Sequence, residues 1–285
     1  EGAGTITCLL HDPGSDLLLA GFVQGPLVAY DTRRMKPLVP LVASGPGEQS
    51  FRISGGVLDM LRDDGQILWV ATRHQGLIGL QWTGKQYSIQ SRLLEFRDDR
   101  QKSHPAALGL DEKGGLWIGT SGGELFYRTP GGKGLQRYRP ESLGETAGGT
   151  GYISGLTWDR RTRTLWISYL VSGIWNYNPQ TGNFRFFSHS PSGVVSRRQP
   201  VVRDIFCDRS GIVWIITYSG KIDKLDPYTQ NFTLYRHHPQ NTNSLSHNAV
   251  TTLYEDRRGT IWIGTQGGLN RFDRATNTFT RFVHN

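Results

Sequence analysis

The sequence lacks the features that mark membrane-spanning and disulfide-rich proteins. No apolar run is long enough to cross a bilayer, and no secretory signal pattern opens the chain. The two cysteines, Cys8 and Cys207, fall at different places in the sequence pattern described below and lack the spacing of a zinc site. We therefore expect two buried thiols, no disulfide and no membrane insertion. Because the chain begins at Glu1 rather than at a methionine, we also expect it to be a processed or shortened form.

Signatures of catalysis and metal binding are also missing. The eight histidines form no i, i+4 pair on a helix, and adjacent His237 and His238 would point to opposite sides of a strand. There is no Gly-x-Ser-x-Gly elbow, and the glycine-rich segment 131–134 lacks the strand-to-helix setting of a phosphate loop. We expect no catalytic residue, no metal site and no cofactor in this chain.

Negative charge is in short supply, and the formal net charge is +8. The resulting excess of positive charge permits attraction to acidic polymers, including acidic polysaccharides. The sequence contains no basic helix and no nucleic-acid-binding motif, so we expect no nucleic-acid partner.

What the sequence does contain is a unit that occurs six times. Its indexing residue is a tryptophan in five copies and a leucine in the first: Leu18, Trp69, Trp117, Trp166, Trp214 and Trp262, at spacings of 51, 48, 49, 48 and 48 residues. An aspartate precedes each by six residues, or by seven in the fourth copy: Asp12, Asp63, Asp111, Asp159, Asp208 and Asp256. A period of about 40–50 residues with four short strands per copy is typical of propeller blades. Because the aspartates are periodic, we interpret them as structural rather than catalytic.

The last copy shows the unit most clearly. Turn signals at 257–259, 266–268 and 274–277 separate four short strands within 251–282, which indicates an antiparallel meander. In Ile261–Gly264 both strand faces are apolar or small, as expected for a strand covered on both sides by neighbouring blades.

These observations predict an all-β fold with almost no helix. The chain is predicted to form a single β-propeller domain, 1–285, of four-stranded antiparallel blades at about 5–41, 53–96, 106–138, 153–187, 201–235 and 249–282. Six blades are visible, so the ring is either six-bladed or most of a seven-bladed one.

The same residues carry a family resemblance. The pattern D-x-x-G-x-(I/L)-W-I-G-T, followed by G-G-L-N-R-(F/Y)-D, resembles the two-component regulator propeller repeat. The sixth copy matches best, with Asp256, Gly259, Trp262, Gly264, Thr265, Gly268, Leu269, Asn270 and Asp273, and the linker 238–248 also resembles that family's. The resemblance implies a periplasmic or otherwise extracytoplasmic sensor domain, followed in the full-length protein by a membrane helix and an output module such as a kinase. It also implies a homodimer in the full-length protein.

Ligand-binding residues are expected in loops on one face of such a fold. Turns between the second and third strands meet the inter-blade loops there, and loops on a rigid scaffold commonly carry function. Tyrosine rings can stack on a sugar while Arg, Asn and Gln bind its hydroxyl and acid groups. The candidates are Arg73, His74, Gln75, Tyr152, Tyr169, Arg203, Tyr218, His247, Asn248 and Gln266. Basic turns on the opposite face, including Arg209 and Arg257, are interpreted as solvated or as a docking surface.

The favoured function is a ligand-sensing propeller that recognises an oligosaccharide, including acidic ones. Two alternatives stay open. One is a propeller-fold lyase or hydrolase acting on acidic polysaccharide, since fold does not fix function. The other is a non-catalytic interaction scaffold.

Overall fold

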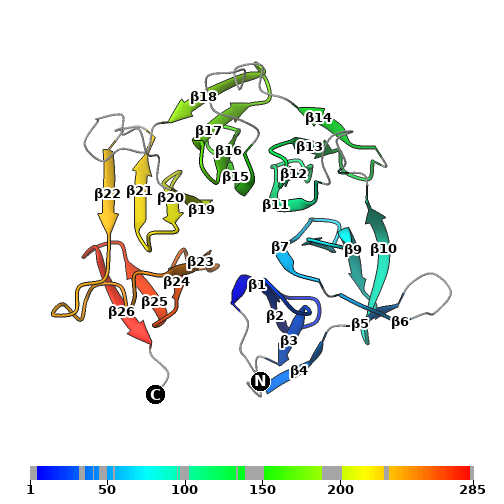
Figure 1. Cartoon of the computed structure of the whole chain (residues 1–285), viewed down its shortest axis with the longest axis horizontal. Helices are drawn as coiled ribbons and strands as arrows, with labels where there is room; N and C mark the ends of the chain where they lie inside the picture. Colours follow the sequence, from blue (N-terminus) through cyan, green and yellow to red (C-terminus); the bar gives the residue numbers. More distant parts are fainter. Residues whose placement is uncertain are drawn as a thin grey trace. The chain divides into compact units, whose positions relative to one another are not determined.

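The computed structural model describes residues 5–31, 36–40, 42–44, 50–53, 55–94, 96, 103–132, 134–138, 151–187, 201–227 and 231–282. These residues are all-β and contain no helix, so none of them forms an apolar helix long enough to span a membrane. The strands form six antiparallel β-propeller blades, which confirms the predicted fold class. The chain divides into two compact units, 1–139 and 140–285, with three blades in each (Figure 1).

Unit 1 holds blades one to three. Blade one consists of β1 (Ile6–Asp12), β2 (Leu17–Phe22), β3 (Val28–Asp31) and β4 (Lys36–Pro40). Blade two consists of β7 (Val57–Arg62), β8 (Ile67–Thr72), β9 (Gly76–Trp82) and β10 (Tyr87–Leu93), with β5 (Val42–Ser44) and β6 (Ser50–Arg52) added. Blade three consists of β11 (Pro105–Leu110), β12 (Leu116–Thr120), β13 (Leu125–Arg128) and β14 (Gln136–Tyr138).

The second sheet contains the four strands predicted at 53–96 and adds two more. Its strand order is β6-β5-β10-β9-β8-β7, because β5 pairs in parallel with the outer edge of β10 and β6 pairs antiparallel with β5. The connection between blades one and two therefore supplies two strands that cover the backbone groups of an edge strand. Their length of three residues each is too short for a pattern in the sequence to predict them.

Unit 2 holds blades four to six, each with four strands in sequential order. Blade four consists of β15 (Ile153–Asp159), β16 (Thr164–Tyr169), β17 (Gly173–Asn178) and β18 (Asn183–Phe187). Blade five consists of β19 (Val202–Cys207), β20 (Val213–Thr217), β21 (Ile222–Asp226) and β22 (Asn231–Tyr235). Blade six consists of β23 (Val250–Glu255), β24 (Ile261–Thr265), β25 (Gly268–Asp273) and β26 (Thr278–Phe282).

The repeated tryptophans occupy equivalent strand positions and form the contacts between neighbouring blades. Trp69 packs with Leu108 and Ile118 of blade three, and Trp166 packs with Ile205 and Ile215 of blade five. Trp69, Trp117, Trp166 and Trp214 are at most 2% exposed, which confirms the prediction that these side chains are mostly buried. Trp262 of blade six is only half-buried, and its neighbours Tyr254, Leu269 and Phe282 are 42–47% exposed.

In blades two, five and six the repeated aspartate binds the tryptophan, which explains the six-residue offset. The carboxylates of Asp63, Asp208 and Asp256 accept a hydrogen bond from the indole N–H of the tryptophan six residues later, at 2.9–3.0 Å. The second carboxylate oxygen accepts from the backbone N–H four residues on, at 2.8–3.1 Å, and so closes the turn. One side chain therefore fixes both the hairpin and the orientation of the indole, and this confirms the structural interpretation.

In blade three the Asp111 carboxylate accepts from the Tyr127 hydroxyl at 2.9 Å, and in blade four Asp159 accepts from the Thr162 hydroxyl at 2.7 Å. Blade one departs further because Leu18 has no side-chain N–H to donate. Its aspartate, Asp12, is fully buried and is bound instead by Arg62 and by the hydroxyls of Tyr87 and Ser15. Arg62 and Tyr87 belong to blade two. With leucine at the tryptophan position, the aspartate of blade one therefore links two blades instead of bonding to a side chain of its own blade.

Neither cysteine forms a disulfide, as predicted. Cys8 is buried on β1, as predicted, whereas Cys207 at the end of β19 is half-buried, which corrects the prediction of two buried thiols. Burial, followed by the nearby carboxylates of Asp159, Asp208 and Glu255, raises the pKa of the Cys207 thiol. A thiol that is held protonated is a poor nucleophile, so Cys207 has the character of a core residue.

Asp204 of β19 provides a pH-dependent prediction. It faces Gly155 of β15 so closely that a Cβ on that glycine would lie 2.5 Å from the carboxylate, and burial raises the pKa of Asp204 to about 6. Because its folded pKa exceeds its unfolded one, the folded state binds the proton more tightly, and stability falls as pH rises from about 4 to 6. Asp204→Asn should therefore raise the free energy of unfolding by up to about 3 kcal/mol at pH 7.5 and leave it unchanged near pH 3.5.

The measurement is urea denaturation at both pH values, with Asp64→Asn on an exposed turn as the control. The asparagine keeps an oxygen that can accept the 2.8 Å hydrogen bond from the N–H of Ile205. An equal change at both pH values would contradict the assignment of the effect to ionisation.

Candidate ligand-binding surface

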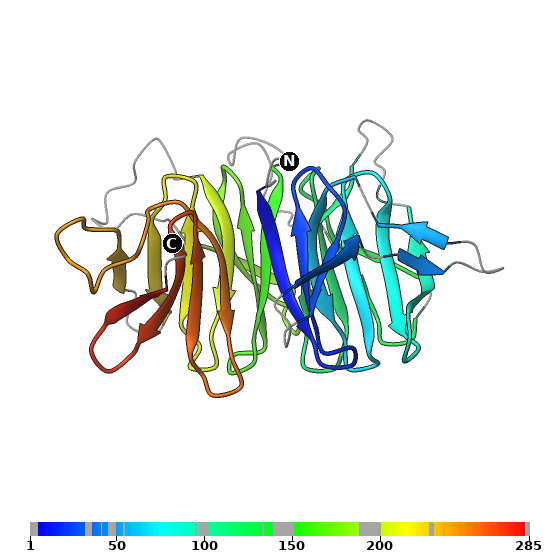
Figure 2. The same cartoon turned by 90° about the horizontal axis from the view of Figure 1, so that it is seen from below.

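One backbone hydrogen bond occurs at the same place in all six blades. The residue after the second strand donates its N–H to the carbonyl of the residue before the first strand, at 2.8–3.0 Å. The donors are Val23, Arg73, Ser121, Leu170, Tyr218 and Gln266, and the acceptors are Thr5, Gly56, His104, Tyr152, Val201 and Ala249. The backbone is thus held identically at six sites, while all six donor side chains differ. Within each unit the strands run alongside one another, so these junctions gather at one end of the strands (Figure 2).

In unit 2 these junctions join into a continuous surface. The carbonyl of Leu170 in blade four accepts a hydrogen bond from the N–H of Val202 in blade five, at 2.9 Å. Gly220 of blade five lies against Asn248 of blade six, where a Cβ would come within 1.8 Å of the Asn248 carbonyl oxygen. Gly220 also has φ +75°, so both its space and its backbone conformation require glycine.

Two of the predicted residues, a half-buried arginine and an exposed tyrosine, form a cationic and aromatic pair on this surface. The guanidinium of Arg203 lies over the ring of Tyr218, with its central carbon 5.6 Å from the ring centroid. Tyr218 is 62% exposed, the largest exposure among the large apolar side chains of the described part of the chain. The cation lies over one face of a ring whose side chain is more than half exposed, so part of the ring is accessible for stacking.

The remaining predicted residues of unit 2 have different environments. Tyr152 is half-buried, and Gln266 and His247 are exposed. Asn248 is also exposed, but its side-chain oxygen accepts a 2.7 Å hydrogen bond from the N–H of His237, which anchors the preceding linker. Tyr169 is only 1% exposed and burial raises its pKa, so we exclude this residue from the ligand-contacting surface.

Unit 1 carries the other three predicted residues. Arg73 and His74 are exposed in the β8–β9 turn, while Gln75 is half-buried and donates to the carbonyl of Arg52 at 3.1 Å. Sequence reasoning missed His104, whose Nδ1 lies 3.1 Å from Oγ of Ser121. Its position directly before a first strand, equivalent to that of Tyr152, is the signal that could have identified it.

The linker before blade six has a structural role. Arg281 donates to the carbonyls of Ser244 and Asn241 at 2.7 and 2.6 Å, which ties the linker to β26. The fully buried Asn270 exchanges hydrogen bonds with Ser246 at 2.8 and 2.9 Å. These contacts join the linker 238–248 to strands β25 and β26, so the linker and Asn270 form one structural unit.

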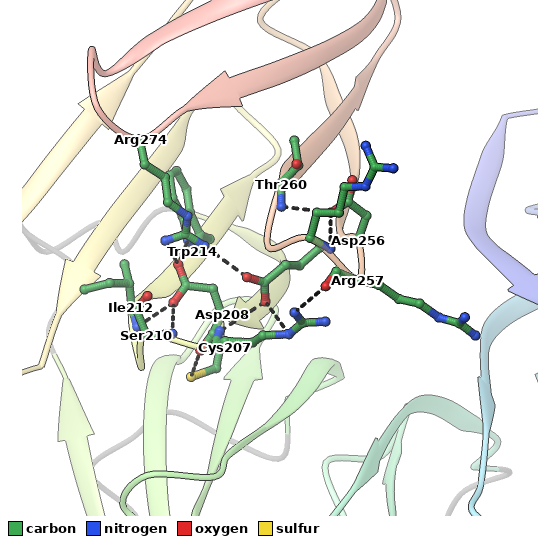
Figure 3. A network of polar contacts seen from close by, with 12 residues as sticks. Cys207, Asp208, Ser210, Ile212, Trp214, Asp256, Arg257, Thr260 and Arg274 are labelled. Atoms are coloured by element: carbon green, nitrogen blue, oxygen red, sulfur yellow. Dashed lines mark hydrogen bonds and ion pairs between the residues drawn. The ribbon is translucent and has the colours of Figure 1, made fainter.

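The basic turns at the opposite end of unit 2 are also engaged in internal contacts. Arg274 bridges the buried carboxylate of Asp208 at 2.8 Å and that of Glu255 at 3.1 Å, and Arg209 donates to the carbonyl of Arg257 at 3.0 Å (Figure 3). These contacts join blades five and six, which favours a structural role for Arg209 over docking. In the described part of the chain, no three His, Cys, Asp or Glu side chains gather in a way that could hold a metal ion.

Comparisons with known proteins agree with this architecture. Residues 244–267 match the family model described as the two component regulator propeller. No curated protein matches the chain. Among solved structures, the chain is similar to the extracellular domain of the hybrid two-component system BT3049 from B. thetaiotaomicron, with TM-score 0.66 and 21% identity over 93% of this chain and 33% of that one.

Two further structures share the fold. The extracellular domain of BT4673 from the same organism has TM-score 0.54 and 19% identity, covering 99% of this chain and 41% of that one. Virginiamycin B lyase from Staphylococcus aureus has TM-score 0.64 and 11% identity, covering 98% and 84%. The chain therefore spans between a third and about two fifths of the two signalling proteins' domains.

Proposed function

We propose that this chain, which is built from two-component regulator propeller repeats, is the ligand-sensing part of an extracytoplasmic signalling protein. The observation that carries the proposal is the backbone hydrogen bond common to all six blades. The backbone at this position is the same in every blade, while the side chain of the donor residue differs. A surface that recognises a ligand needs such variation, since identical blades would offer identical contacts. In the full-length protein, ligand binding would act on an output module through the geometry of a homodimer.

The ligand class that fits the surface of unit 2 is an acidic oligosaccharide. The accessible part of the Tyr218 ring can stack on the apolar face of a sugar ring, and Arg203 beside it can bind a carboxylate or sulfate through paired N–H donors. Tyr152, His247 and Gln266 line the same surface and offer hydrogen bonds to hydroxyls.

Calorimetry with matched acidic and neutral oligosaccharides tests this proposal. We expect an acidic member to bind, Arg203→Ala and Tyr218→Ala each to weaken binding about tenfold or more, and added salt to weaken it further. Arg160→Ala and Tyr254→Ala are the matched controls, because these exposed residues lie away from the junctions on which the proposal rests.

Each other outcome has a definite meaning. Binding that both substitutions leave unchanged would place the ligand elsewhere and contradict the proposed surface. Turnover of an oligosaccharide would favour a lyase or hydrolase, in line with the fold shared with virginiamycin B lyase. An absence of binding to every oligosaccharide would favour the interaction scaffold.

A further inference from the structure

Exposed apolar side chains gather at the junction between blades four and five. The carbonyl of Leu170, directly after β16, accepts a hydrogen bond from the N–H of Val202 at 2.9 Å. Val171 and Val201, the residues beside these two bonded groups, are therefore neighbours across the junction, and both are exposed. The N–H of Tyr218 donates to the carbonyl of Val201 at 2.9 Å, so the exposed Tyr218 side chain belongs to the same junction.

Phe186 of β18 extends this apolar surface within blade four. A Cβ on Gly173, two residues after Val171, would lie 2.8 Å from the ring of Phe186, so the ring packs on backbone that a side chain would obstruct. The ring of Trp175 lies 5.1 Å away between centroids, yet Phe186 is still exposed. Single exposed apolar residues are ordinary, whereas a connected group marks an interaction site. We call this group the apolar strip: Val171, Phe186, Val201 and Tyr218.

A β-bulge places one cation beside the strip. In β19 the register with β20 shifts between Val202 and Asp204, so Arg203 is the extra residue of a bulge. The same shift occurs at the second residue of the first strand in all six blades. The residues at this position are Thr7, Leu58, Ala106, Ser154, Arg203 and Thr251. Bulges re-aim side chains, and the arginine is the charged member of the set. Its guanidinium lies over Tyr218, at one end of the strip.

The strip and the cation suit different parts of one ligand. Arg203 can bind a carboxylate or sulfate through paired N–H donors. The side chains of Val171 and Val201 offer no hydrogen bond, so a sugar hydroxyl placed against them would lose its bond to water without replacement. An apolar group in the same place would instead be stabilised by its removal from water. The junction therefore favours a ligand with an acid group and an apolar group over a saccharide with hydroxyls alone.

We propose that Arg203 and the apolar strip together bind an acidic saccharide that carries an apolar substituent, such as an aryl or acyl group. This inference rests on the proposed function and narrows its ligand class. The acid group pairs with Arg203, and the sugar ring stacks on Tyr218. The substituent then covers Val201 and Val171, in the order that the hydrogen bonds across the junction give them, and extends toward Phe186.

Three matched glycosides, titrated against the chain and followed by NMR, test this inference. They are methyl β-D-glucuronide, 4-nitrophenyl β-D-glucuronide and 4-nitrophenyl β-D-glucoside. We expect the nitrophenyl glucuronide to bind about tenfold or more tightly than the methyl glucuronide, because its ring covers the strip. The nitrophenyl glucoside, which lacks the acid group, should bind more weakly than the nitrophenyl glucuronide.

The double variant Val171→Thr, Val201→Thr should remove most of the preference for the nitrophenyl glucuronide. Each change keeps a β-branched side chain and exchanges a methyl group for a hydroxyl, so the shape of the junction is retained. Binding of the methyl glucuronide should be unchanged, which also shows that the variant is folded. Leu234→Thr on β22 is the matched control, because Leu234 is as exposed as Val201 and should leave the preference intact.

The outcomes separate this inference from the proposed function. Equal affinities for the methyl and nitrophenyl glucuronides, or a preference that the double variant retains, would overturn the inference and leave an acidic ligand in place. No binding of the nitrophenyl glucuronide would overturn it as well, while the acidic oligosaccharides still test the proposed function. Equal binding of the nitrophenyl glucoside would contradict recognition of the acid group in both proposals. A dimer that the double variant dissociates would assign the strip to a contact between two copies and overturn the inference.

Discussion

Replacing Trp214 with alanine should lower the free energy of unfolding by about 3–5 kcal/mol, while the same change at Trp262 should lower it markedly less. Trp214 is fully buried, and its ring centroid lies 5.1 Å from that of Phe272 in the neighbouring blade. Its removal would open a cavity between blades five and six and would leave Asp208 without the indole donor. Both losses destabilise the folded state.

Trp262 is a matched comparison within the same chain. It makes the same 3.0 Å hydrogen bond to its own aspartate, Asp256, but it is only half-buried. The difference between the two variants therefore isolates the contribution of burial between blades. Denaturation followed by circular dichroism measures both, and equal losses would contradict the conclusion that inter-blade packing dominates.

The second large effect is expected at Arg274, whose replacement by alanine should cost about 2–4 kcal/mol. The side chain of Asp208 is fully inaccessible to solvent, and Arg274 lies 2.8 Å from it. Removing the arginine leaves a buried carboxylate without its cation, and the resulting penalty exceeds the value of an ordinary surface ion pair. The arginine is itself partly exposed, which places the expected loss below that of a fully buried pair.

The control for Arg274 is Arg258→Ala, which removes an exposed arginine from the neighbouring turn. Arg274→Lys should recover part of the loss, since lysine restores the charge but cannot bridge Asp208 and Glu255 as two parallel donors. Chemical denaturation of the three variants gives the comparison. A loss of less than about 0.5 kcal/mol in Arg274→Ala would show that the contact has no more weight than a solvated ion pair.

The fold was predictable because its information is local and repeated. The aspartate, the turn and the tryptophan lie within seven residues. Their hydrogen bonds therefore require a constant distance along the sequence between the aspartate and the tryptophan. Repetition made the offset visible six times, at six residues in five copies and at seven in the fourth. The strands β5 and β6 escaped prediction because they occur once and depend on the open edge of β10 rather than on their own pattern.

The residues of the candidate site were less predictable, because they depend on which loops come together in the folded chain. The sequence by itself determined the blades, the role of the aspartates and the end of the strands at which variable residues gather. Only the tertiary structure decided that Tyr169 is buried, that Arg203 covers Tyr218, and that Ser121 lies beside the His104 ring. The reason is physical: a strand and its turn are specified by neighbours in the chain, whereas burial and charge depend on residues tens of positions away that packing brings together.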